Sequence, residues 1–174
     1  MFGIPGLTAL GLLHAALGVG ALALGLTMVL QPKGTPRHRR IGQGYVLAML
    51  FLNLTALSIY HLFGRFGPFH VASMISLATI CAGFVPVFTR RPRIGWMDLH
   101  AHFMCWSYVG LVAAFLAEVG VRTPGLHFGL AVNVATVVTI AIGAVVIFRQ
   151  VPKILARFAR RETPTDGAVV PRRS

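Results

Sequence analysis

Apolar residues are concentrated in five stretches of this chain, and each stretch is long enough to cross a membrane as a helix. Crossing the hydrocarbon core takes about 20 residues of α-helix. The five stretches are Leu7–Leu30, Gln43–Phe63, Phe69–Phe88, His100–Gly120 and Leu126–Phe148. Short segments that contain Gly or Pro separate them, as is typical of turns. The pattern predicts an all-α fold in which residues 1–150 form one integral membrane bundle of five transmembrane helices.

The distribution of basic residues predicts how this bundle is oriented in the membrane. The chain is 56% hydrophobic and 11% charged with a net charge of +12, a balance that argues against a soluble domain. Of its 16 Lys and Arg residues, only Arg65 and Arg122 lie on the side of the bundle where the chain begins. Cytoplasmic loops carry the excess of basic residues, so we expect the N-terminus outside and the C-terminus in the cytoplasm.

The basic residues lie between and after the apolar stretches, so the expected partner is the lipid bilayer and not a nucleic acid. Residues 151–161 are predicted to form a basic amphipathic juxtamembrane segment. Such a segment binds anionic lipids of the inner leaflet. Residues 162–174, which contain Pro and Gly, are predicted to be a disordered cytoplasmic tail.

Polar side chains form a stripe along the predicted helix Trp96–Arg122. His100, Ser107 and Glu118 fall within about 40° of one line at the helical period. Such a stripe is unfavourable against lipid and should face other helices or a cavity.

The helix rise sorts the intramembrane polar residues into three layers. The outer layer contains Tyr60, His61, His70, Glu118 and His127. The layer near mid-membrane contains His14, Asn53, Tyr108 and Asn133. The cytoplasmic layer contains His38, Asp98, His100 and His102.

The outer layer has the ligand types of a metal site. Imidazole and carboxylate groups bind zinc, iron and manganese, which makes His70, Glu118 and His127 candidate ligands. We expect His70 and Glu118 to meet there and form the working site. The alternative is local, because Arg122 follows Glu118 by four residues and an ion pair at that spacing accounts for the carboxylate.

His14 is the most informative polar residue of the first predicted helix. It shares a face with Gly18, Ala21 and Gly25, and a stripe of small residues lets helices approach closely. The imidazole is therefore predicted to point into the bundle. It is either a neutral core histidine bonded to a neighbouring polar side chain or a ligand or proton-relay group.

Three strings resemble a known family of bacterial membrane proteins. They are KGTPRHRRIGQGYVLAM from Lys33, NLTALSIYHLFGRFGPFH from Asn53 and HAHFMCWSYVGLVAAFLAE from His100. The family is domain of unknown function 2306, and the resemblance covers about residues 7–145. It implies a small multi-pass helical bundle in the bacterial inner (plasma) membrane. Its signature positions here include His38, Arg39, Asn53, His70, His100, Ser107, Tyr108 and Glu118, whereas His61 is not among them.

Three classes of function stay open. In the first, the polar core, which includes Tyr60, binds a metal or redox cofactor (haem b or a divalent cation) or relays protons. Haem needs two histidines at one depth on facing helices. In the second, the protein is a small proton or solute transporter or channel, expected to work as a homodimer because five spans enclose only a narrow pathway. In the third, it is a membrane assembly subunit without chemistry.

Overall fold

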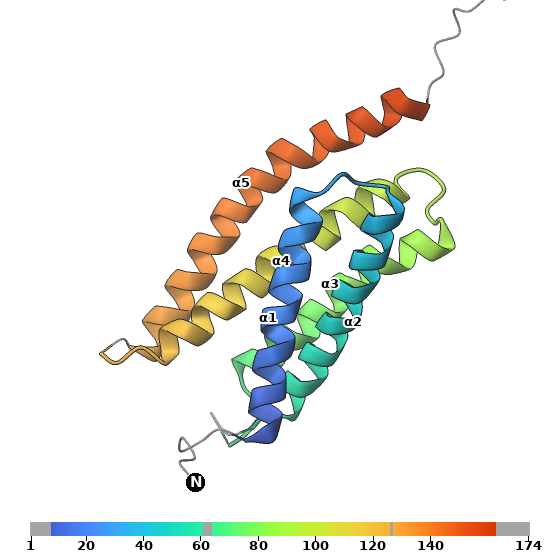
Figure 1. Cartoon of the computed structure of the whole chain (residues 1–174). Coiled ribbons are helices and arrows are strands. Elements are labelled where there is room, and N and C mark those ends of the chain that lie inside the picture. The colour runs from blue at the N-terminus through green and yellow to red at the C-terminus, as the bar shows by residue number, and fades with distance from the viewer. Residues whose placement is uncertain (1–7, 61–63, 126, 163–174) are drawn as a thin grey trace, which may run out of the picture.

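Five α-helices make up the fold, and among the described residues there is no β-strand. The computed structural model describes residues 8–60, 64–125 and 127–162. The helices are α1 (Ala9–Leu30), α2 (Pro36–Ser58), α3 (Pro68–Thr89), α4 (Trp96–Val121) and α5 (Phe128–Glu162). All 5 are long and apolar enough to cross a membrane. The predicted all-α, five-span architecture is confirmed (Figure 1).

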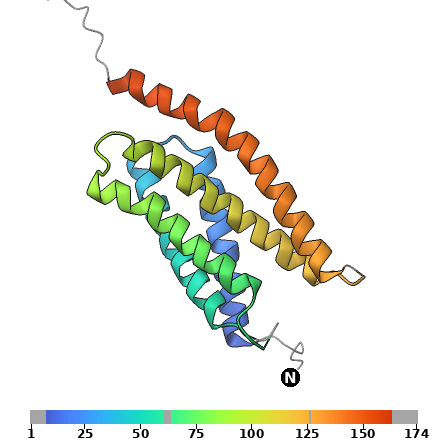
Figure 2. The same cartoon turned by 180° about the vertical axis from the view of Figure 1, so that it is seen from behind.

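Helices α1 to α4 form a four-helix bundle in which chain neighbours pack side by side and α4 also contacts α1. Helix α5 lies outside this bundle and packs along α4 (Figures 1 and 2). We call the end where α1 begins the amino-terminal end. The opposite end, formed by the α1–α2 loop, the α3–α4 loop and the last turns of α5, is the basic end.

Capping residues set where the helices begin, so the helices do not start where the apolar stretches do. The backbone N–H of His38 donates to the Thr35 hydroxyl at 3.1 Å, and Pro36 occupies the first turn of α2. Both are features that favour a helix start. Helix α2 therefore begins before Gln43, the predicted start, and His38 is helical.

Helix α5 continues well past the end of its apolar stretch. It runs for 35 residues through Pro152, about 52 Å at the helix rise, whereas a hydrocarbon core is about 30 Å thick. Val151 is buried, and a Cβ on Gly34 would lie 3.0 Å from the Phe158 ring. The predicted juxtamembrane segment is thus a continuation of α5 that packs on the α1–α2 loop. The predicted tail, apart from Glu162, lies outside the described residues.

Small residues on α1 allow close packing, as their periodicity predicts. Ala21 is fully buried. A Cβ on Gly25 would lie 2.3 Å from Cδ2 of Tyr108 and 3.1 Å from Cε2 of Tyr45. Gly25 therefore makes room for two aromatic rings at the centre of the bundle.

Candidate functional site

Two tyrosines and a serine connect three helices in the middle of the bundle. The Tyr45 hydroxyl donates to Ser107 Oγ at 2.9 Å, because the Ser107 hydroxyl itself donates to the Met104 carbonyl at 2.9 Å. Tyr108 donates to the Leu22 carbonyl at 3.4 Å, and the two tyrosine rings meet edge to face with centroids 6.5 Å apart. This layer spans α1, α2 and α4.

Asn53 forms the next polar layer towards the amino-terminal end. Its side chain is 5% exposed. Its amide Nδ2 donates to the Met49 carbonyl at 2.7 Å and to the Ser76 hydroxyl at 3.1 Å. These bonds satisfy both amide hydrogens and join α2 to α3.

His14 bonds to a hydroxyl on α2. Its Nδ1 lies 2.9 Å from Thr55 Oγ1, and Thr55 donates its own hydrogen to the Leu52 carbonyl at 2.8 Å. His14 Nδ1–H is therefore the donor, as in the core-histidine interpretation. Thr55 lies one turn from the end of α2, so His14 is nearer to the amino-terminal end than the predicted mid-membrane depth.

His100 occupies the basic end and is held by a backbone carbonyl of α3. Its Nδ1 lies 2.8 Å from the Gly83 oxygen, which can only accept, so Nδ1 carries the proton and Nε2 keeps its lone pair. Gly83 presents no side chain, and Pro86 lies one turn further on inside α3. Pro86 removes the N–H that would bond the carbonyl of Ala82, four residues earlier, and bends α3 next to this contact.

His38 lies across the bundle from His100, on α2. Its Nδ1 is buried and has no hydrogen-bond partner in the part of the chain that the structure describes. Both histidines lie within the first two turns of helices that begin at the basic end, so they share one depth. Arg39, the neighbouring signature position, is exposed.

His70 is almost fully buried at the amino-terminal end, with 3% of its surface exposed. Its Nδ1 accepts from the Gly67 backbone N–H at 3.1 Å, closing the first turn of α3. The rings of Tyr60 and Phe66 pack against it at centroid distances of 4.5 and 5.0 Å. Because Nδ1 accepts, a neutral His70 carries its proton on Nε2, and no described residue accepts that proton.

Glu118 is paired locally, with Arg122. The two side chains form an ion pair and are 38% and 67% exposed. Arg122 also donates to the Glu118 carbonyl at 3.0 Å. The expected contact between His70 and Glu118 is not formed, because Arg122, four residues on, takes the carboxylate.

The candidate metal ligands do not converge among the described residues. No three His, Cys, Asp or Glu side chains gather there. His127 is exposed in the loop before α5, and His61 lies outside the described residues. The protonated Nε2 of His70 also disfavours ligation, because a metal needs the lone pair. Metal binding at this end stays a prediction.

The structure adds partners that sequence reasoning did not single out, namely Thr55, Ser76 and the Gly83 carbonyl. A depth comparison identifies Thr55, because His14 and Thr55 lie at similar distances from the ends of their predicted spans. No sequence signal identifies Ser76 or the Gly83 carbonyl as a partner. A single hydroxyl in an apolar stretch has no distinguishing spacing, and every residue has a backbone carbonyl.

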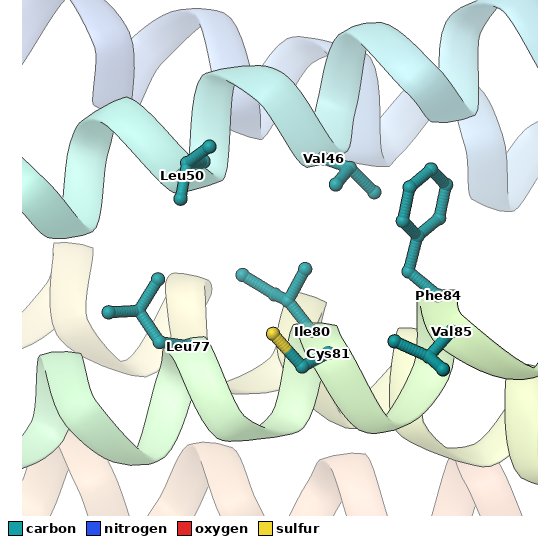
Figure 3. A pocket seen from close by; sticks show the side chains of 7 residues that line it. All are labelled: Val46, Leu50, Leu77, Ile80, Cys81, Phe84 and Val85. Carbon is teal, nitrogen blue, oxygen red and sulfur yellow. The ribbon is translucent and has the colours of Figure 1, made fainter.

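An apolar groove of about 240 Å³ lies between α2 and α3. Figure 3 shows Val46 and Leu50 on α2 facing Leu77, Ile80 and Phe84 on α3 across it. Its lining contains no titratable group other than the Cys81 thiol. The groove suits a hydrocarbon chain and offers no chemistry of its own.

Comparison with known proteins gives one match. No curated protein and no solved structure matches the chain. The family model described as predicted membrane protein, domain of unknown function 2306, matches residues 11–155, which include α2, α3 and α4 in full together with His14, His38, His70 and His100. The chain therefore belongs to the domain of unknown function 2306 family of membrane proteins.

Proposed function

We propose that this protein relays protons between the two ends of its four-helix bundle. The observation that carries the proposal is a series of buried and half-buried polar side chains inside α2, α3 and α4. From the basic end it comprises His38 and His100, then Tyr45 and Ser107, then Asn53 and Ser76, then Ser73 and His70. Polar groups inside a membrane are energetically costly, and where they occur they often mark a path for ions or protons. This series extends along the whole interior of the bundle.

The relay requires water molecules to connect the steps of this series. Tyr45 and Asn53 are about 12 Å apart along α2, and Ser76 and His70 about 9 Å apart along α3, by the helix rise. Buried water bridges polar groups that lack protein partners. Hydroxyl groups, which both donate and accept, can pass a proton along such a chain, and the amide oxygen of Asn53 can hold a water molecule in it.

The two terminal histidines have opposite free nitrogens. His100 offers the lone pair of Nε2 at the basic end, because its Nδ1–H is held by Gly83. His70 offers the proton of Nε2 at the amino-terminal end, because its Nδ1 accepts from Gly67. His100 can therefore take up a proton at Nε2, whereas His70 can release its Nε2 proton only when a second proton reaches Nδ1 in place of the Gly67 contact.

The charge distribution supports an orientation for this relay. We place the basic end in the cytoplasm of a bacterial cell and the amino-terminal end outside, with the protein in the inner membrane. The basic face of α5 then meets the anionic lipids of the inner leaflet. A homodimer would provide a wider polar interior than one bundle.

A second candidate is a cofactor bound at the basic end, favoured by the His100 geometry. Metal-bound histidines usually donate their other ring N–H to a carbonyl or carboxylate, as His100 does to Gly83. His38 lies at the same depth on a facing helix, the arrangement that haem b needs. An optical spectrum and metal analysis of purified protein test this: a Soret band that His100→Leu abolishes supports haem, and protein without haem or stoichiometric metal contradicts it.

Proton flux into liposomes tests the relay. Protein would be reconstituted around a pH-sensitive dye, and a potassium diffusion potential would drive protons inward. We expect faster acidification than in protein-free liposomes, slowed several-fold by Tyr45→Phe or Asn53→Leu, because each breaks one step of the series. Thr27→Val is the control, since among the described residues its hydroxyl bonds only the Ala23 carbonyl of its own helix. A wild-type flux equal to that of protein-free liposomes contradicts the proposal.

A further inference from the structure

The basic end carries a cleft between the α1–α2 loop and the last turns of α5. Its volume is about 410 Å³. Leu30 and Lys33 line one side, and Ile154, Arg157 and Phe158 line the other. Figure 1 shows the end of α5 passing over the loop that joins α1 to α2. The cleft combines two cations with an apolar wall at the depth where the spans end.

Lys33 has hydrogen-bonding capacity left for a ligand in this cleft. Its ammonium group donates to the Met28 carbonyl, and to the Val29 carbonyl at 2.8 Å. An ammonium group has three N–H donors, so one remains. Burial lowers the pKa of Lys33 from its ordinary value, and a bound anion would favour the charged form.

The end of α5 separates charge from apolar surface. At the helical period Arg149, Lys153 and Arg157 fall within about 80° of one another. Ile154 and Phe158 point to the other side, against the loop, where a Cβ on Gly34 would lie 3.0 Å from the Phe158 ring. Arg157 is exposed and forms no ion pair with any described residue. Its planar guanidinium suits a phosphate, which it can bind through two hydrogen bonds.

We propose that this cleft binds one anionic phospholipid, with its phosphate between Lys33 and Arg157 and its acyl chains along Leu30, Ile154 and Phe158. The inference rests on the proposal that the basic end meets an anionic leaflet. It adds that one lipid binds in a defined cleft, beyond the general attraction between the basic face of α5 and the leaflet. The lining of the cleft, part basic and part apolar, favours a phospholipid over a free phosphate. A free phosphate would leave the apolar wall exposed, whereas a phospholipid covers both the two cations and the apolar wall.

Lipid binding to the detergent-purified protein, followed by native mass spectrometry, tests the site. Phosphatidylglycerol and phosphatidylcholine with the same acyl chains would be titrated. We expect the wild-type protein to bind phosphatidylglycerol more tightly. Arg157→Gln should weaken that binding about tenfold or more, because it removes the charge-assisted hydrogen bonds to the phosphate. Phe158→Ala should weaken binding of both lipids, because it shortens the apolar wall.

Arg93→Gln is the matched control. Arg93 is exposed in the α3–α4 loop at the same end, so its loss removes the same charge without touching the cleft. We expect its phosphatidylglycerol affinity to stay within about twofold of wild type. Equal weakening by Arg93→Gln and Arg157→Gln would overturn the site while leaving a general preference for anionic lipid. Equal affinity of the wild-type protein for both lipids would overturn that general preference too. Matching melting temperatures without added lipid establish that the variants are folded.

Discussion

Gly25→Ala should destabilise the protein although it adds only one methyl group. The new Cβ would lie 2.3 Å from Cδ2 of Tyr108, a distance that real side chains do not tolerate, and 3.1 Å from Cε2 of Tyr45, a tight contact. Overpacking of this kind destabilises by about 1–3 kcal/mol. Tyr108 cannot move aside freely, because its hydroxyl bonds the Leu22 carbonyl and such a bond contributes about 1 kcal/mol. We therefore expect a loss near 3 kcal/mol.

Gly20→Ala on the same helix is the control. A Cβ on Gly20 has no neighbouring atom within 4 Å, and alanine is favoured over glycine in a helix by up to about 1 kcal/mol. The two substitutions should therefore change stability in opposite directions. Thermal unfolding in detergent, followed by circular dichroism, measures both, at about 2–4 °C per kcal/mol for a chain of this size.

Two outcomes would refute this reasoning. A Gly25→Ala variant as stable as Gly20→Ala would mean that the tyrosine rings do not pack on α1 as described. Full additivity in the double variant Gly25→Ala/Tyr108→Leu would mean the same, because removing the ring should relieve the clash and make the double variant better than the sum of its parts.

Two further predictions concern the amino-terminal end. His70→Ala should destabilise the protein by about 1–3 kcal/mol, because it removes a helix cap and a buried ring packed between two aromatic side chains; an unchanged melting temperature would contradict the capping role. Glu118→Gln should lower stability by at most about 1 kcal/mol, as expected for a partly exposed ion pair, and its effect should add to that of His70→Ala within about 0.5 kcal/mol. Clear non-additivity in the same unfolding assay would restore the site shared by His70 and Glu118.

Local chemistry made much of the fold and part of the site predictable. A helix satisfies its backbone groups within its own segment in lipid, and each apolar stretch has the length of a membrane-spanning helix, so the all-α class follows from the apolar pattern. The Glu118–Arg122 pair follows from spacing alone, as one of the two interpretations anticipated. The glycine stripe of α1 indicated the packed face, because small residues mark close approach between helices in a membrane.

Tertiary structure decided which polar groups meet. Tyr45 and Ser107 are 62 residues apart in the chain, and their bond depends on the rotation of two helices that face each other across the bundle. In a membrane both the lipid-facing and the core-facing sides of a helix are apolar, so periodicity says little about that rotation. The same ambiguity hid the Gly83 carbonyl that fixes the tautomer of His100. The sequence by itself determined the helices, their polar residues and the pair within one helix, and packing determined the partners that lie on different helices, because those depend on how the helices are rotated against each other.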